Sequence, residues 1–156
     1  MIDTKMSLDT RLILKVFRIG QYFFKRKKSF IYLFIYLFIK LFYTLIQIIY
    51  GFSLPFSAKI GRNVCFRHGF YGIFISSHAE IGNNVIIMHQ VTIGSNYSSL
   101  NEICAPVLKD NIFVGPGAKI IGNVVVESNT KIGANALLVN QSLEPGIYVS
   151  SRATKL

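Results

Sequence analysis

Residues 108–138 read LKDNIFVGPGAKIIGNVVVESNTKIGANALL, a stretch in which a branched aliphatic residue returns at every sixth position. A second set, five residues into each hexad, is small or β-branched. A helical period of 3.6 or a strand period of 2 does not produce a period of six, whereas a solenoid of short β-strands does. The aliphatic set is Leu108, Val114, Ile120, Val126, Ile132 and Leu138, and the second set is Ile112, Ala118, Val124, Thr130, Ala136 and Ser142.

The same period extends upstream through Ile75, Ile81, Ile87 and Ile93. Three hexads are expected to close one triangular coil, so that aliphatic side chains point to the axis and residues 18 apart stack. The period slips by three residues around 70–72 and by nine in 95–105. Such insertions become protruding loops on a rigid scaffold. We therefore predict a mainly β fold, a parallel β-helix over 52–145 with a loop at 95–105, and a tail at 146–156.

The positive charge is concentrated before the repeats. The 156 residues are 51% hydrophobic with a net charge of +10, a composition that excludes a disordered chain and suits one domain with an appendage. Residues 1–50 carry nine basic and two acidic side chains, and the remainder carries eight and five. Two cysteines, Cys65 and Cys104, make neither a disulfide framework nor a metal box, so both are expected to be inert in a reducing cytoplasm.

Residues 1–51 are expected to form an α-helical segment. Arg11, Lys15, Arg18, Tyr22 and Lys25 fall on one stripe of an amphipathic helix. After the cluster 25–28, residues 30–50 form an apolar run whose polar members share one helical face, namely Tyr36, Lys40, Tyr43, Thr44 and Gln47.

Three interpretations of this segment stay open. It lies in the interface of an anionic membrane, on the inner face of the cytoplasmic membrane. It packs on its own domain or a neighbouring subunit. It spans the bilayer once, with Lys40 at a costly depth. Nucleic acid is not a predicted partner, because no binding motif accompanies the charge.

Two of the three histidines occupy equivalent places in the repeat. His68 and His89 each stand at position 3 of a hexad, and their separation of 21 equals one coil plus the three-residue insertion. They should lie on one face, one rung apart, with the loop 95–105 near them. Because histidine titrates near neutral pH, the pair is a candidate general-base site. His78 is expected at the surface, and no carboxylate or cysteine joins the histidines at metal-ligand spacing.

Several motifs resemble the hexapeptide-repeat acyltransferases, especially the serine acetyltransferase branch and its capsule, colanic acid and O-antigen acetyltransferase relatives. The resemblance covers about residues 54–145. It implies a left-handed β-helix that forms homotrimers, with acetyl-CoA in the groove between two subunits. It rests on AKIGRN at 58–63, FRHG at 66–69, AEIGNN at 79–84, HQVTIG at 89–94 and VGPGAKIIGN at 114–123.

The resemblance also implies roles for particular residues. His68 matches the catalytic histidine, which takes the proton from the acceptor hydroxyl. The place of His89 in the repeat, rather than the resemblance, makes it the second candidate catalytic residue. Segments 117–119 and 133–136 match stretches that line the pantetheine arm. Ala118 and Ala136 stack, and their small side chains either leave room for a ligand or only suit the coil. The candidate cofactor-binding residues are Gly117, Ala118, Lys119, Lys131, Ala136 and Arg152, with Lys155 as a further phosphate contact.

Two positions depart from serine acetyltransferases, and the N-terminal segment is shorter than their helical domain. Arg67 replaces the aspartate before the catalytic histidine, which leaves Glu80 or Glu102 to orient His68. Ala105 replaces the histidine before the loop proline. The sequence therefore favours an acetyl-CoA-dependent O-acetyltransferase acting on a sugar hydroxyl of a surface polysaccharide or its precursor. Serine O-acetylation and an inactive solenoid scaffold are the alternatives.

Overall fold

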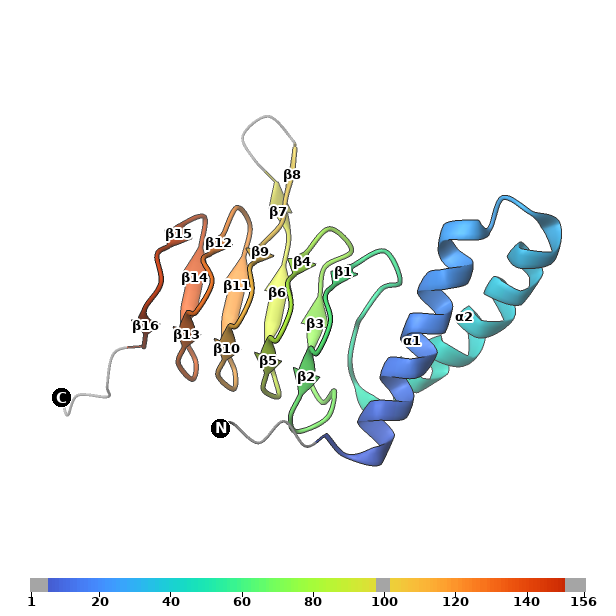
Figure 1. The fold of residues 1–156 in the computed structure, drawn as a ribbon, viewed down its shortest axis with the longest axis horizontal. Coiled ribbons are helices and arrows are strands. Elements are labelled where there is room, and N and C mark those ends of the chain that lie inside the picture. Colours follow the sequence, from blue (N-terminus) through green and yellow to red (C-terminus); the bar gives the residue numbers. More distant parts are fainter. Residues whose placement is uncertain (1–5, 98–101, 151–156) are drawn as a thin grey trace.

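The computed structural model describes residues 6–97 and 102–150, in which two packed helices precede a parallel β-solenoid (Figure 1). Helix α1 spans Leu8–Arg26 and helix α2 spans Phe30–Tyr50. The predicted architecture, a mainly β solenoid of repeats with an N-terminal helical segment, is confirmed.

Short parallel strands form the three faces of the solenoid. Face 1 consists of β1 (Lys59–Ile60), β4 (Glu80–Ile81), β9 (Val107–Leu108), β12 (Val125–Val126) and β15 (Ser142–Leu143). Face 2 consists of β2 (Cys65–Phe66), β5 (Ile86–Ile87), β10 (Phe113–Val114), β13 (Lys131–Ile132) and β16 (Ile147–Tyr148). Face 3 consists of β3 (Phe74–Ile75), β6 (Thr92–Gly94), β11 (Lys119–Ile121) and β14 (Leu137–Val139).

The strand register confirms both insertions. Ile60 pairs with Ile81, 21 residues on, and Ile81 pairs with Leu108, 27 residues on. These separations are one 18-residue coil plus three and plus nine. The nine-residue insertion forms an antiparallel hairpin of β7 (Asn96–Tyr97) and β8 (Ile103–Cys104), which protrudes from the solenoid in Figure 1.

The aliphatic column is the core of the domain. All six periodic residues of 108–138 are between 0 and 5% exposed. Full burial of each such side chain contributes roughly 1.5–3 kcal/mol. Glycine after the aliphatic residue lets the rungs approach, because a Cβ on Gly61 would lie 2.2 Å from the carbonyl oxygen of Gly82.

The last coil is shorter than the period predicts. Val126 pairs with Leu143, and Ile132 pairs with Tyr148, separations of 17 and 16 residues. Ser142 is therefore exposed rather than in the buried fifth position. Because β16 still pairs with β13, the solenoid continues to Tyr148, and the predicted boundary at 145 is corrected.

Asparagines build the corner between faces 1 and 2. Asn63, Asn84, Asn111 and Asn129 have φ between 55° and 64°, and their side-chain amides donate from each to the next over 3.1–3.2 Å. Asparagine tolerates this left-handed conformation better than most residues. A polar ladder thus runs down one edge of the solenoid.

The helices cover the N-terminal end of the solenoid. The guanidinium of Arg18 donates to the carbonyl of Ile60, 2.6 Å away, and to that of Gly61, and Gln21 donates to Ala58 over 2.9 Å. Partial burial lowers the pKa of Arg18. The ring of Phe56 stacks on Tyr43 with centroids 4.6 Å apart. The predicted polar stripe of α1 is exposed, and Arg18 within it also caps the first coil.

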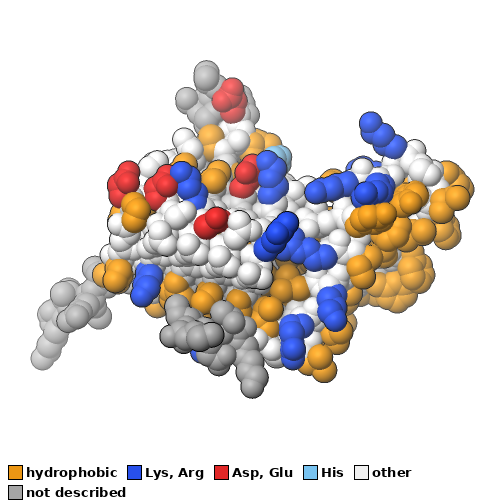
Figure 2. Space-filling model, in the orientation of Figure 1, with side chains coloured by type: hydrophobic (Ala, Val, Ile, Leu, Met, Phe, Trp, Pro, Cys, Tyr) orange, Lys and Arg blue, Asp and Glu red, His pale blue; other side chains and the backbone are white. Residues whose placement is uncertain are grey.

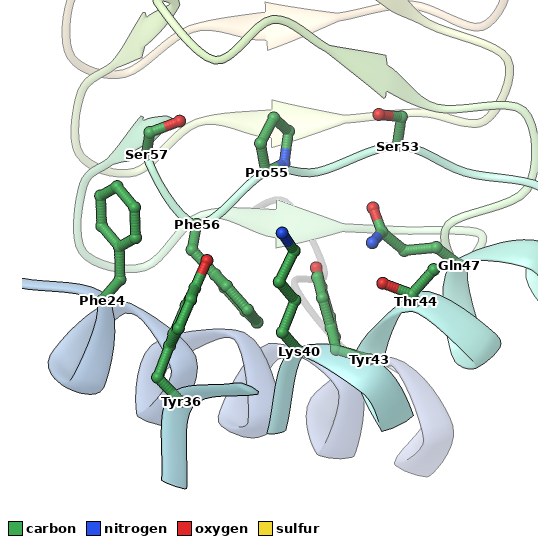
Figure 3. A pocket seen from close by; sticks show the side chains of 10 residues that line it. All are labelled: Phe24, Tyr36, Lys40, Tyr43, Thr44, Gln47, Ser53, Pro55, Phe56 and Ser57. Carbon is green, nitrogen blue, oxygen red and sulfur yellow. The ribbon is translucent and has the colours of Figure 1, made fainter. Parts of the chain in front are cut away.

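Helix α2 turns Tyr36, Tyr43 and Gln47 of its polar stripe inward, whereas Lys40 and Thr44 are exposed at the mouth of the cavity beside them. Tyr36 and Tyr43 are buried, and the amide of Leu54 donates to Gln47 Oε1 over 2.9 Å. Figure 3 shows Lys40 and its neighbours on α2 extending toward the segment 53–57, around a cavity of about 280 Å³. The lining residues are Phe24, Tyr36, Lys40, Tyr43, Thr44, Gln47, Ser53, Pro55, Phe56 and Ser57.

Candidate functional site

The two predicted site histidines lie side by side. Phe66 pairs with Ile87 in face 2, and His68 and His89 each follow their strand by two residues. Their ring centroids are 5.5 Å apart and the planes meet at 76°, an edge-to-face arrangement. His68 is exposed and His89 is partly buried. The predicted juxtaposition on neighbouring rungs is present in the structure.

The predicted cofactor segments continue along the same corner, between faces 2 and 3. The amide of Gly117 donates to the carbonyl of His89 over 3.1 Å, and the amide of Asn135 donates to the carbonyl of Pro116 over 2.9 Å. Consecutive rungs therefore place the histidines, the 115–118 turn and the 133–136 turn in one column. We name this column, defined by His68, His89, Gly117 and Asn135, the histidine corner.

The turn at Gly117 depends on glycine. Its φ is +73°, and a Cβ there would lie 2.1 Å from Oδ1 of Asn135. Lys119 follows this turn and donates from Nζ to the carbonyl of Gln90 over 2.9 Å. A residue with a side chain at position 117 would therefore clash with Asn135, the next residue along the histidine corner.

Ala118 and Ala136 face the coil interior. They are 0% and 3% exposed, so a ligand at the corner could meet only their backbone. The same fifth position holds Val91 and Val124, which are fully buried too. Their burial agrees with the second of the two interpretations given above, in which the small side chains suit the coil.

The remaining predicted cofactor residues stand elsewhere. Lys131 is exposed on face 2, beside the asparagine ladder rather than at the histidine corner. Arg152 and Lys155 lie outside the described residues.

Neither predicted carboxylate is placed to orient His68 within the chain. Glu80 belongs to face 1 and forms an ion pair with Lys59. Glu102 lies in the insertion, at the corner between faces 3 and 1. The expectation that this loop approaches the histidines is therefore wrong for a single chain, because the hairpin and the histidine corner occupy opposite ends of the face 3 strands.

The structure adds two features that the repeat could not indicate. Nδ1 of His89 is buried without a hydrogen-bond partner among the described residues. The start of α1 reaches the histidine corner, because a Cβ on Gly69 would lie 3.7 Å from Oγ1 of the buried Thr10. Both features arise from contacts between segments that are far apart in the sequence, and such contacts do not show in the six-residue period.

The other candidate groups are separate from this corner. Nδ1 of His78 is 3.0 Å from the hydroxyl of Ser77, at the corner between faces 3 and 1. Cys65 is buried and Cys104 is partly buried, and the two do not form a disulfide. Within residues 6–97 and 102–150, no three His, Cys, Asp or Glu side chains are grouped to hold a metal ion.

Comparisons with known proteins agree with the coil geometry. Residues 105–140 match the family described as bacterial transferase hexapeptide (six repeats). This agrees with a left-handed β-helix of hexapeptide repeats. No curated protein sequence matches the chain.

Solved structures with the same fold include several serine acetyltransferases. Soybean serine acetyltransferase complexed with serine is 24% identical, with a TM-score of 0.73 over 92% of this chain and 55% of that one. Isoform 3 from Entamoeba histolytica, in complex with cysteine, is 24% identical, with a TM-score of 0.69 over 92% and 49%. A serine acetyltransferase in complex with CoA is 27% identical, with a TM-score of 0.66 over 85% and 50%. The chain spans about half the length of these structures.

Proposed function

We propose that this chain is an acyltransferase that moves an acetyl group from acetyl-CoA to a hydroxyl group, with His68 as the general base. The observation that carries the proposal is the histidine corner itself. It places an exposed imidazole in one column with the Gly117 turn, on a coil whose relative is solved with CoA. An exposed imidazole can take the proton of an acceptor hydroxyl, and the Gly117 turn beside it has no side chain to obstruct the pantetheine arm of acetyl-CoA.

The chemistry follows from the position of His68. Its free ring nitrogen accepts the hydroxyl proton as the acceptor oxygen attacks the thioester carbonyl. Backbone N–H groups stabilise the oxyanion of the tetrahedral intermediate. When that intermediate collapses, the carbon–sulfur bond breaks, and the imidazolium returns its proton to the CoA thiolate. His89 acts as a positioning residue, because its ring packs edge-on against His68.

The site is proposed to form between copies of the chain in a homotrimer. One chain holds the histidine corner and the hairpin at opposite ends of face 3. A hairpin that closes over His68 must therefore come from a neighbour, which would also bring Glu102 within reach of another chain's histidine corner.

Serine is the acceptor that the comparisons favour, because the solved relatives are serine acetyltransferases and the soybean one was solved with serine. Two residues favour a sugar hydroxyl of a surface polysaccharide or its precursor. Arg67 and Ala105 stand where the resemblance to serine enzymes calls for aspartate and histidine. Both acceptors use the same base and donor, so the proposal at His68 does not depend on the choice.

The test is acceptor-dependent release of CoA thiol, measured with L-serine, with free sugars and with polysaccharide. We expect His68→Gln to lower kcat by about 10²–10⁴-fold, the range for loss of a general base. Arg62→Gln is the control, since it changes an exposed side chain at the corner between faces 1 and 2, away from both the histidine corner and the hairpin, and it should keep full activity. Turnover of serine alone would exclude the polysaccharide acceptor, and turnover of glycans alone would exclude serine. The absence of acceptor-dependent thiol release with any hydroxyl compound would overturn the proposal and favour a scaffold, and equal loss of activity in both variants would overturn the role of His68.

A further inference from the structure

The outward half of α2 is an uncovered apolar surface. Eleven large apolar side chains of this helix are exposed, by 37–82%, and no described segment covers them. Figure 2 shows hydrophobic side chains gathered over this end of the molecule, with Lys and Arg at their margin. We name this surface the α2 face: Phe30, Ile31, Leu33, Phe34, Leu37, Phe38, Leu41, Phe42, Leu45, Ile48 and Ile49.

Positive charge adjoins this surface at one end. Lys25 and Arg26 end α1, and Lys27 and Lys28 lie in the turn that leads into Phe30. Arg26 lies over the ring of Tyr22 at 3.8 Å, and Lys27 over that of Phe24 at 4.4 Å. In the described part of the helical segment, Asp9 is the single acidic residue. The other described carboxylates belong to the solenoid and the hairpin.

We propose that the α2 face and the Lys25–Lys28 cluster bind an anionic membrane surface, with α2 lying in the interface plane. Apolar burial in the acyl boundary and attraction to anionic head groups act together in such helices. The cytoplasmic leaflet carries the anionic lipids that attract polybasic segments. A second copy of the chain would use only the apolar part of this surface and would gain nothing from the cations.

The packing of α2 favours this orientation over a crossing of the bilayer. By length and composition α2 could span a membrane. Its inner side, however, is engaged along the helix, through Tyr36, Tyr43 and the hydrogen bond from Leu54 to Gln47. Lys40 points to the cavity behind the helix and not into the α2 face (Figure 3). Interfacial binding keeps these contacts, whereas spanning would break them and put Lys40 into hydrocarbon.

Vesicle sedimentation of the full chain tests the inference, independently of the proposed enzymatic activity. The wild type should bind vesicles of equimolar phosphatidylcholine and phosphatidylglycerol and should bind pure phosphatidylcholine much more weakly. Lys25→Gln with Lys28→Gln should weaken binding by at least about tenfold, since each cation near the surface contributes about 1 kcal/mol. Added salt should weaken binding of the wild type in the same direction.

A second variant tests whether the apolar side chains of the α2 face contribute to vesicle binding. Phe38→Glu with Phe42→Glu changes two neighbouring outer rings that are 60% and 51% exposed, with centroids 4.7 Å apart and planes at 59°. This variant should lose vesicle binding. Ile147→Glu with Val149→Glu makes the same charge change at residues 73% and 74% exposed on the far end of the solenoid and should bind as the wild type does.

Four results would overturn the inference. They are no binding to anionic vesicles, equal binding to neutral ones, wild-type binding by the Phe38/Phe42 variant, and resistance to alkaline carbonate extraction, which indicates a span. Unchanged circular dichroism and thermal melting of each variant establish that it is folded. If light scattering shows that the Phe38/Phe42 variant changes subunit number while vesicle binding persists, the α2 face is an interface between copies.

Discussion

At the residue scale, Tyr43 shows how an aromatic residue on the inward side of α2 is buried together with its hydroxyl group. The residue is 1% exposed, its ring stacks on Phe56, and its hydroxyl is buried without a hydrogen-bond partner among the described residues. Burial disfavours the phenolate and raises the pKa of Tyr43 well above its ordinary value. The buried hydroxyl therefore lowers the free energy of unfolding, and burial of the aromatic ring offsets this loss.

We predict that Tyr43→Phe stabilises the protein by about 1 kcal/mol at neutral pH, because it removes an unsatisfied buried group. In the wild type the folded-state pKa exceeds the unfolded one. The stability that Tyr43 contributes is therefore complete below about pH 10 and is lost above it, by up to about 1.4 kcal/mol per pH unit. Urea unfolding at about pH 8 and about pH 11 measures both effects. The exposed Tyr22→Phe is the control, and equal alkaline slopes in the wild type and the Tyr43 variant would contradict the prediction.

At the element scale, α1 acts as a cap on the first coil. On the helix side, no described strand lies beside the first rung to donate hydrogen bonds to its face 1 carbonyls, so the carbonyls of Ala58, Ile60 and Gly61 need other donors. Arg18 and Gln21 supply them. A solenoid end that is covered in this way does not pair with another chain.

Arg18→Met keeps most of the apolar stem but removes both donors. We expect the free energy of unfolding to fall by about 1–2 kcal/mol. This range is smaller than for two fully buried hydrogen bonds, because the guanidinium is partly in solvent. Hydrogen exchange around residues 58–61 should quicken before that of the later coils. Lys15→Met, at an exposed position of the same stripe, should change neither quantity. Equal unfolding curves for the Arg18 variant and the wild type would show that α1 is not the cap.

At the scale of the whole molecule, the separation of the hairpin from the histidine corner bears on assembly. Face 3, which joins the two corners, exposes Phe74, Leu137 and Val139 by 50%, 65% and 43%. Apolar side chains on a strand surface of this kind suit an interface between copies. Three copies around one axis would bring each hairpin toward the next chain's histidines.

We predict that the wild type is a trimer in light scattering and that Leu137→Glu yields smaller species with little acyltransferase activity. A buried carboxylate without a partner in the interface is costly, which is the reason for the loss. Leu12→Glu, at a comparably exposed position on α1, should stay trimeric and active. A fully active wild-type monomer, or a trimeric Leu137 variant, would contradict this assembly.

The hexad spacing by itself determined the solenoid, both insertions and the pairing of His68 with His89, because a coil of fixed length converts sequence separation into position along the axis. It did not place the last coil, in which Leu143 stands one position and Tyr148 two positions before the places that a strict period requires. Tertiary structure alone decided that the hairpin leaves from the corner opposite His68 and that α1 caps the first rung. It also decided that Tyr36, Tyr43 and Gln47 of α2 face inward and that the apolar side of this helix faces outward. The helical period separates a polar face from an apolar face but does not indicate which of them is buried. Packing against Phe56 and the first coil selects the buried face.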